Sequence, residues 1–65
     1  MNKSKLKTAR IARGWTQLEL AERSGVSRPT ISLLERGVTS GNIRTLTCLA
    51  DALGMSVEYL FLRQK

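Results

Sequence analysis

Apolar residues along this chain recur three or four positions apart, the spacing that places side chains on one face of an α-helix. The pattern is clearest in the second half, where four such residues stand between positions 43 and 53. No stretch alternates apolar and polar residues for long enough to predict a strand. The predicted inward faces are Leu20, Ala21, Ser24, Ile31, Leu34, Ile43, Leu46, Ala50 and Leu53, and the rest of the predicted core is Leu6, Ala9, Trp15, Val26, Val57 and Leu60.

Glycines divide the pattern into short helices. Four of the five glycines each follow a helix-forming stretch, where a residue that tolerates positive φ best closes a helix. These are Gly14, Gly25, Gly37 and Gly54. Each helix is therefore expected to end close to one of these positions.

The expected helix starts agree with these ends. Thr16 and Glu19 have the spacing of a capping box, while Ser27, Asn42 and Ser56 can each cap the helix that follows. The prediction is an all-α domain with helices near 4–13, 17–24, 28–36, 43–53 and 57–62. A chain of 65 residues has room for one compact core only.

The composition excludes several kinds of chemistry. The chain has one cysteine, Cys48, and no histidine, so we expect neither a disulfide nor a zinc site. Five acidic residues leave few groups for acid–base catalysis, and we expect neither an enzyme nor a cofactor. Apolar runs are too short to cross a bilayer and the start has no secretion signal, so we expect a cytoplasmic protein without membrane contact.

Positive charge is in excess and unevenly placed. Eleven Lys and Arg against five Asp and Glu give a formal net charge of +6. Five of these cations precede the first acidic residue, Glu19. Such a surface is suited to a polyanion, although a solvated basic face that aids solubility has the same composition.

The segment from 17 to 36 predicts two short helices joined by a tight corner. Ala21 is small enough to let the two helices cross closely, and Gly25 can turn the chain with positive φ. Ile31 and Leu34 then hold the helix near 28–36 against the helix near 17–24. The outward face of the helix near 28–36 is left available to a partner.

The residues of this segment resemble the phage-repressor and Cro type (XRE) helix-turn-helix family, with a match that extends from about Leu6 to Leu60. The resemblance implies a lambda-repressor-like domain over 1–65, with the motif at about 17–36 and a recognition helix at about 28–36 in the major groove of DNA. It also implies a homodimer on a pseudo-palindromic operator. The matching motifs are Gln17-Leu18-Glu19-Leu20-Ala21, Gly25-Val26-Ser27, Thr30-Ile31-Ser32 and Leu34-Glu35-Arg36-Gly37.

The same resemblance implies roles for individual residues. It implies an inward salt bridge between Arg10 and Glu35, which joins the first helix to the end of the third. The residues implied to bind DNA phosphates are Thr16, Gln17, Arg36, Asn42 and Arg44. The residues implied to read bases are Arg28, Pro29, Thr30 and Leu33, with Ser27 and Ser32 at the margins.

Pro29 departs from the polar residue that many family members carry at this position. Proline lacks an amide hydrogen and suits only the first turn of a helix, so Pro29 fixes where this helix starts. It also disfavours a helical residue before it, so that either Ser27 or Arg28 could be the cap. Arg28 could accordingly read guanine or bind phosphate.

The C-terminal segment is richer in apolar residues than a small core requires on one side. It is a candidate dimer surface, with a lid over the core as the competing interpretation. The candidate interface residues are Met55, Val57, Tyr59 and Phe61.

These patterns favour a DNA-binding transcriptional regulator, acting as a repressor or autoregulator. The resemblance also admits an antitoxin that binds a toxin protein as well as DNA, and the control protein of a restriction-modification system. All three kinds of protein would share the same DNA-binding helix-turn-helix, so the sequence does not separate them. A membrane-active cationic helix is disfavoured because the positive charge is not paired with one long amphipathic face.

Overall fold

The computed structural model describes residues 4–62, and this part of the chain contains helices and no strand. The all-α prediction is confirmed, and the two ends of each predicted helix lie within two residues of the ends of an observed helix. The fifth element is a single π-helical turn. The elements are α1 (Lys5–Ala12), α2 (Gln17–Ser24), α3 (Arg28–Glu35), α4 (Ile43–Leu53) and η1 (Glu58–Leu62).

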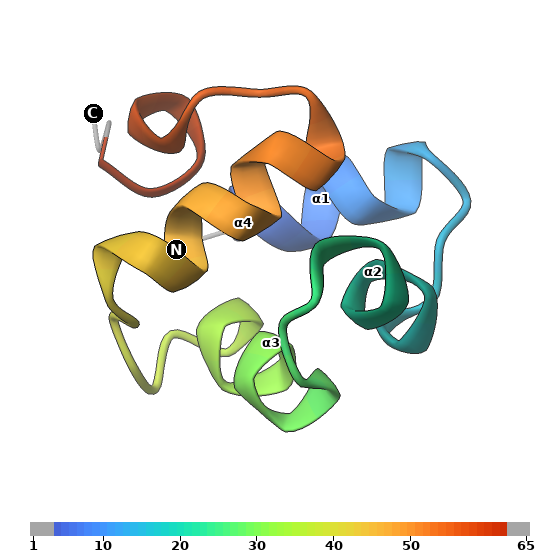
Figure 1. The fold of residues 1–65 in the computed structure, drawn as a ribbon, viewed down its shortest axis with the longest axis horizontal. Coiled ribbons are helices and arrows are strands. Elements are labelled where there is room, and N and C mark those ends of the chain that lie inside the picture. The colour runs from blue at the N-terminus through green and yellow to red at the C-terminus, as the bar shows by residue number, and fades with distance from the viewer. Residues whose placement is uncertain (1–3, 63–65) are drawn as a thin grey trace.

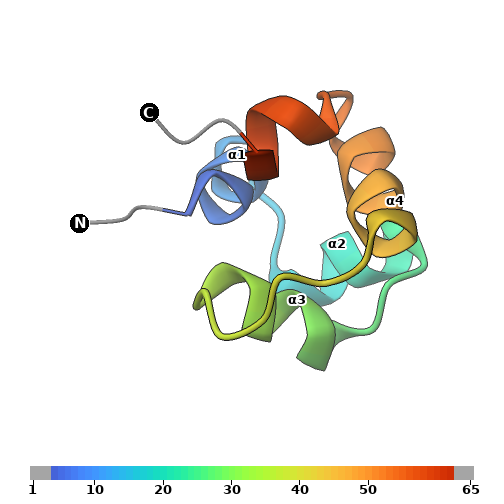
Figure 2. The ribbon, with the colours of Figure 1, turned by 90° about the vertical axis from the view of Figure 1, so that its left-hand side faces the viewer.

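The helices surround one apolar core. Helix α2 packs against α3 and α4, while α1 packs against α3 and η1. Figures 1 and 2 show α3 at one end of the molecule and η1 at the opposite end, beside α1. The buried core residues are Leu6, Ala9, Leu20, Ile31, Leu34, Leu46, Leu49, Ala50, Leu53 and Leu60.

Side-chain caps begin the helices where the sequence predicts them. Thr16 Oγ1 accepts from the Glu19 amide at 3.0 Å, and Glu19 Oε1 accepts from the Thr16 amide at 3.0 Å, which completes the capping box. Ser27, Asn42 and Ser56 each accept from the backbone amide three residues on. These contacts satisfy first-turn donors that have no partner within a helix.

The corner between α2 and α3 depends on a left-handed glycine. Gly25 has a φ of 79°, and its amide donates to the Ala21 carbonyl at 2.9 Å. A Cβ at this position would meet no atom within 4 Å, so the constraint comes from the backbone conformation alone. The turn between α2 and α3 therefore depends on the conformation of Gly25.

Helix α4 corrects one core prediction. Ile43 was expected to face inward but is 65% exposed, whereas Leu49, which the prediction omitted, is 0% exposed. Ile43 is the first residue of α4, at the end of the helix that follows the exposed segment 38–42. The inward stripe therefore starts one turn later, at Leu46.

The remaining predicted core positions lie at the edge of the core. Ala21 and Ser24 on α2 are only half-buried. Trp15, Val26 and Val57 are also half-buried, and together with Ala21 they pack against the buried residues. They cover the core instead of forming its centre.

Candidate nucleic-acid interface

Helix α3 has one face in the core and one face in solvent. Ile31 is fully buried and Leu34 is 9% exposed, so both hold the helix against its neighbours. Arg28 and Pro29 are exposed at its start, and Leu33 is 36% exposed further along. Ser27 is exposed as well, so four of the six residues predicted to read bases are open to a partner.

The start of α3 resolves the question that Pro29 raised. Ser27 is the cap, with extended backbone (φ −65°, ψ 148°), and Arg28 is the first helical residue. Pro29 follows in the first turn, where a missing amide hydrogen costs no helical bond. Arg28 is thus helical despite the proline after it, and its exposed side chain extends from the helix start.

Two hydroxyl groups at this end are already paired. Ser27 Oγ accepts from the Thr30 amide at 3.4 Å and donates to Thr30 Oγ1 at 2.8 Å. Because Thr30 Oγ1 accepts this bond, its own hydrogen remains available to donate. Thr30 and Ser32 are half-buried, so they lie at the edge of the exposed face of α3 and not at its centre.

Arg10 and Glu35 form the ion pair that the family resemblance implied. Arg10 Nε lies 2.7 Å from Glu35 Oε2, and Arg10 Nη2 donates to Glu35 Oε1 at 3.1 Å. The two side chains are 11% and 3% exposed. Glu35 is the last residue of α3, where a carboxylate opposes the helix dipole, so the guanidinium offsets an unfavourable placement. The pair joins α1 to the end of α3.

Gln17 makes a contact that the sequence did not predict. Its Nε2 donates to Glu35 Oε1 at 3.0 Å, and the side chain is half-buried. A glutamine at a helix start is normally solvated, and only the fold brings position 17 beside position 35. Gln17, whose side chain is expected to bind the DNA backbone, is therefore hydrogen-bonded to the last residue of α3.

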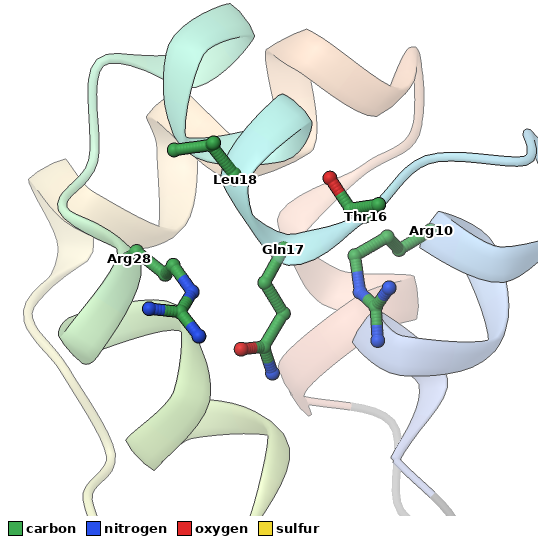
Figure 3. Close-up of a pocket in the computed structure, with 5 residues that line it drawn as sticks. All are labelled: Arg10, Thr16, Gln17, Leu18 and Arg28. Carbon is green, nitrogen blue, oxygen red and sulfur yellow. The ribbon is translucent and has the colours of Figure 1, made fainter.

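Gln17 also lines an open hollow between the starts of α2 and α3. Figure 3 shows its amide between the guanidinium groups of Arg28 and Arg10. The first-turn amides of Gln17 and Leu18 have no acceptor within α2, so they can donate into the hollow. Arg28 adds positive charge, and the hollow is therefore suited to an anion. The hollow is lined by Arg10, Thr16, Gln17, Leu18 and Arg28.

The other predicted phosphate contacts lie beyond the far end of α3. Arg36 directly follows α3, Asn42 caps α4 and Arg44 lies in the first turn of α4, and all three are exposed. Asn42 Oδ1 is occupied by the Thr45 amide at 2.9 Å, which leaves the side-chain nitrogen to donate. Within residues 4–62, neither Arg36 nor Arg44 has an acidic ion-pair partner.

The C-terminal apolar residues have two different environments. Met55, Val57 and Phe61 pack against the core, as in the lid interpretation. Tyr59 is 48% exposed, and the Lys5 ammonium lies 4.6 Å from the centre of its ring. These residues lie around η1, at the end of the molecule opposite α3 (Figures 1 and 2).

Arg13 connects α1 to the end of α4 in a way that sequence reasoning missed. It donates to the Ala9 carbonyl at 3.0 Å and also to the Leu53 carbonyl at the end of α4. Its guanidinium lies 5.9 Å from the centre of the Trp15 ring, and that of Arg23 lies 4.4 Å from it. Backbone acceptors leave no mark in a sequence pattern, so no motif could have indicated these contacts.

Other kinds of site find little support in the part of the chain that the structure describes. Residues 4–62 hold no cluster of His, Cys, Asp and Glu that could bind a metal ion. No described helix combines the length and the apolar character needed to cross a membrane. Cys48 is a half-buried free thiol.

A family model described as helix-turn-helix matches residues 6–60 of the chain. The chain is 35% identical over 60 residues to an uncharacterised HTH-type transcriptional regulator of Methanocaldococcus jannaschii, a match that covers 92% of this chain and 91% of the relative. No solved structure gives a significant match.

Two further relatives are longer than this chain. One is an uncharacterised HTH-type transcriptional regulator of Mycobacterium tuberculosis, 47% identical over 45 residues, which covers 69% of this chain and 32% of the relative. The other is an SPbeta prophage-derived uncharacterised HTH-type transcriptional regulator of Bacillus subtilis, 32% identical over 56 residues, with coverage of 86% and 52%. The matched region is thus about a third of the mycobacterial relative and half of the prophage one.

Proposed function

Because the chain belongs to the Cro-type (XRE) helix-turn-helix family, we propose that it is a sequence-specific transcriptional regulator that binds double-stranded DNA. The observation that carries the proposal is the geometry of α3, whose buried face is held by the core while Arg28, Pro29 and Leu33 face solvent. A formal net charge of +6 favours a polyanionic partner. The relatives that the chain matches carry the names of transcriptional regulators and not of enzymes, in agreement with the few catalytic groups in the sequence.

Base readout is assigned to the exposed face of α3 in the major groove. Arg28 can donate two hydrogen bonds to guanine O6 and N7, and Leu33 can contact a thymine methyl. The Thr30 hydroxyl, polarised by Ser27, is best suited to a base acceptor. Pro29 contributes shape alone, and Ser32 lies at the margin of this face.

Phosphate contacts are assigned to both ends of the motif. Thr16 and Gln17 lie at the start of α2, where helix amides and side-chain donors can bind one backbone strand. Arg36, Asn42 and Arg44 are placed to bind the other strand. Contacts of this kind position a protein on DNA without reading its sequence.

A homodimer on a pseudo-palindromic operator completes the proposal, with repression or autoregulation through occupancy of that operator. The C-terminal face is the proposed dimer surface, supported by the exposure of Tyr59. Val38 and Ile43, which follow α3 in the chain and are 62% and 65% exposed, are the competing candidates for the dimer surface. Sedimentation of Tyr59→Lys and Ile43→Lys variants, with and without DNA, distinguishes the two surfaces because a cation placed in the true interface dissociates the dimer.

The decisive experiment selects bound sites from random duplex DNA and then compares single substitutions. Arg28→Ala should cost about 1–3 kcal/mol for each bound subunit on the selected site and relax the preference at one base position of each half-site. Arg36→Ala should weaken binding to every sequence alike and lower the salt slope by about 1 for each bound subunit. Lys7→Ala, which removes an exposed charge from α1, is the matched control and should leave base preference unchanged. Binding that is indifferent to sequence in the wild-type protein would refute the proposal.

A further inference from the structure

Glu35 is a rigid acceptor shared by two other elements. Its Oε2 accepts from Arg10 Nε at 2.7 Å, and its Oε1 accepts from both Arg10 Nη2 at 3.1 Å and Gln17 Nε2 at 3.0 Å. The side chain is 3% exposed, so water hardly competes for these bonds. The guanidinium is held on its other side as well, because Arg10 Nη1 donates to the Trp15 carbonyl at 2.8 Å.

The contact with Glu35 decides which way the Gln17 amide faces. A carboxylate accepts hydrogen bonds but cannot donate them, so the amide nitrogen and not the amide oxygen must point at Glu35. This contact uses one hydrogen of Nε2 and leaves the second to donate elsewhere. The amide lies in the hollow between the starts of α2 and α3 (Figure 3).

We propose that Glu35 is a positioning residue for phosphate recognition, which acts through Gln17 without touching DNA itself. The buried carboxylate holds the Gln17 side chain in one orientation, with its second Nε2 hydrogen available to a phosphate oxygen in the hollow. An unattached glutamine would lose rotamer freedom on binding, and this cost is removed when the side chain is already ordered. The inference rests on the proposed DNA-binding function.

A purely structural role for Glu35 predicts a different result, because its effect on DNA affinity would then follow folding stability alone. Two double variants separate the roles. R10M/E35Q keeps a side-chain oxygen that can accept from Gln17, whereas R10M/E35L has none. Both remove the ion pair and keep the net charge of the wild type, so long-range attraction to DNA and its salt slope stay comparable.

Affinity for the selected duplex is measured at a temperature where circular dichroism shows both variants to be folded. R10M/E35L should bind about tenfold more weakly than R10M/E35Q for each bound subunit, the effect of weakening one hydrogen bond to a charged group. Adding Gln17→Ala to each variant should abolish this difference. Equal affinities of the two double variants, or a difference that persists without Gln17, would overturn the proposal.

A measurement on the unaltered protein keeps the inference testable if the variants fail to fold. The two side-chain amide hydrogens of Gln17 are resolved by NMR in the free protein and after addition of duplex. One should exchange slowly with water before DNA is added, and the other should shift when DNA binds. Fast exchange of both hydrogens, or no shift of either, contradicts the positioning role. Absence of selective DNA binding by the wild type is a separate result, which refutes the proposed function instead.

Discussion

Replacing Glu35 with alanine should destabilise the domain more than any surface substitution. Among residues 4–62, the change removes the only carboxylate paired with Arg10 and leaves that guanidinium, 11% exposed, with the Trp15 carbonyl as its remaining acceptor there. It also removes the acceptor of the Gln17 amide. Breaking a buried ion pair by removing one partner costs about 3–5 kcal/mol, because the other charge remains buried without compensation.

That cost is large relative to the stability of the whole domain. At ordinary values per residue, a chain of this length has a free energy of unfolding of about 3–10 kcal/mol. One kcal/mol shifts the Tm of a domain of this size by about 4–8 °C. The Glu35→Ala variant should therefore melt at least about 12 °C below the wild type, or be largely unfolded at room temperature.

Thermal melting followed by far-UV circular dichroism measures the shift, and urea titration followed by Trp15 fluorescence gives an independent free energy. R10M/E35L is the matched control, since replacing both charges with apolar side chains is often neutral or stabilising. A Glu35→Ala variant that melts within about 4 °C of the wild type would show that the ion pair does not hold α1 to α3.

Three further tests, which use five substitutions, examine local features. Gly41 and Gly54 share a φ of 69°, but only at Gly41 would a Cβ lie 3.1 Å from a leucine methyl. Gly54→Ala should lower the free energy of unfolding by about 1–2 kcal/mol, because alanine is strained at this φ. Gly41→Ala should lower it measurably more, because the leucine must also move, and urea denaturation measures both losses. Equal losses would show that the leucine yields without cost. Thr16→Ala removes the capping box and should cost about 1 kcal/mol, seen as a lower Tm, whereas an unchanged Tm would mean that solvent replaces the cap. Leu49→Ala should cost about 2–5 kcal/mol while Ile43→Ala stays within about 0.5 kcal/mol, and the reverse order would place Ile43 and not Leu49 in the core.

The sequence predicted those parts of the candidate interface that depend only on residues close together in the chain. Pro29 and Ser27 together locate the start of α3, since proline suits only a first helical turn and serine caps it. The exposure of Arg28 follows from its place at that start. The pairing of Arg10 with Glu35 came from family resemblance alone, because no local pattern links residues so far apart.

Long-range contacts explain what sequence reasoning missed. Gln17 was expected to bind a phosphate, which stays a prediction, and nothing in the sequence indicated that it also donates to a buried carboxylate at the end of another helix. Arg13 was counted only as surface charge, but it reaches the Leu53 carbonyl at the end of α4. In both cases the partner lies on a different element, so helix periodicity carries no information about it.

The sequence by itself determined the helices, because caps, glycine stops and apolar spacing act within a few residues of one another. It also determined most of the core, since a helix with one apolar stripe has one face to bury. Only the tertiary structure decided where the stripe of α4 begins, because burial of Ile43 depends on which elements lie opposite it. The tertiary structure alone likewise decided that one carboxylate serves both Arg10 and Gln17, since hydrogen bonds between helices require packed elements to bring donor and acceptor together.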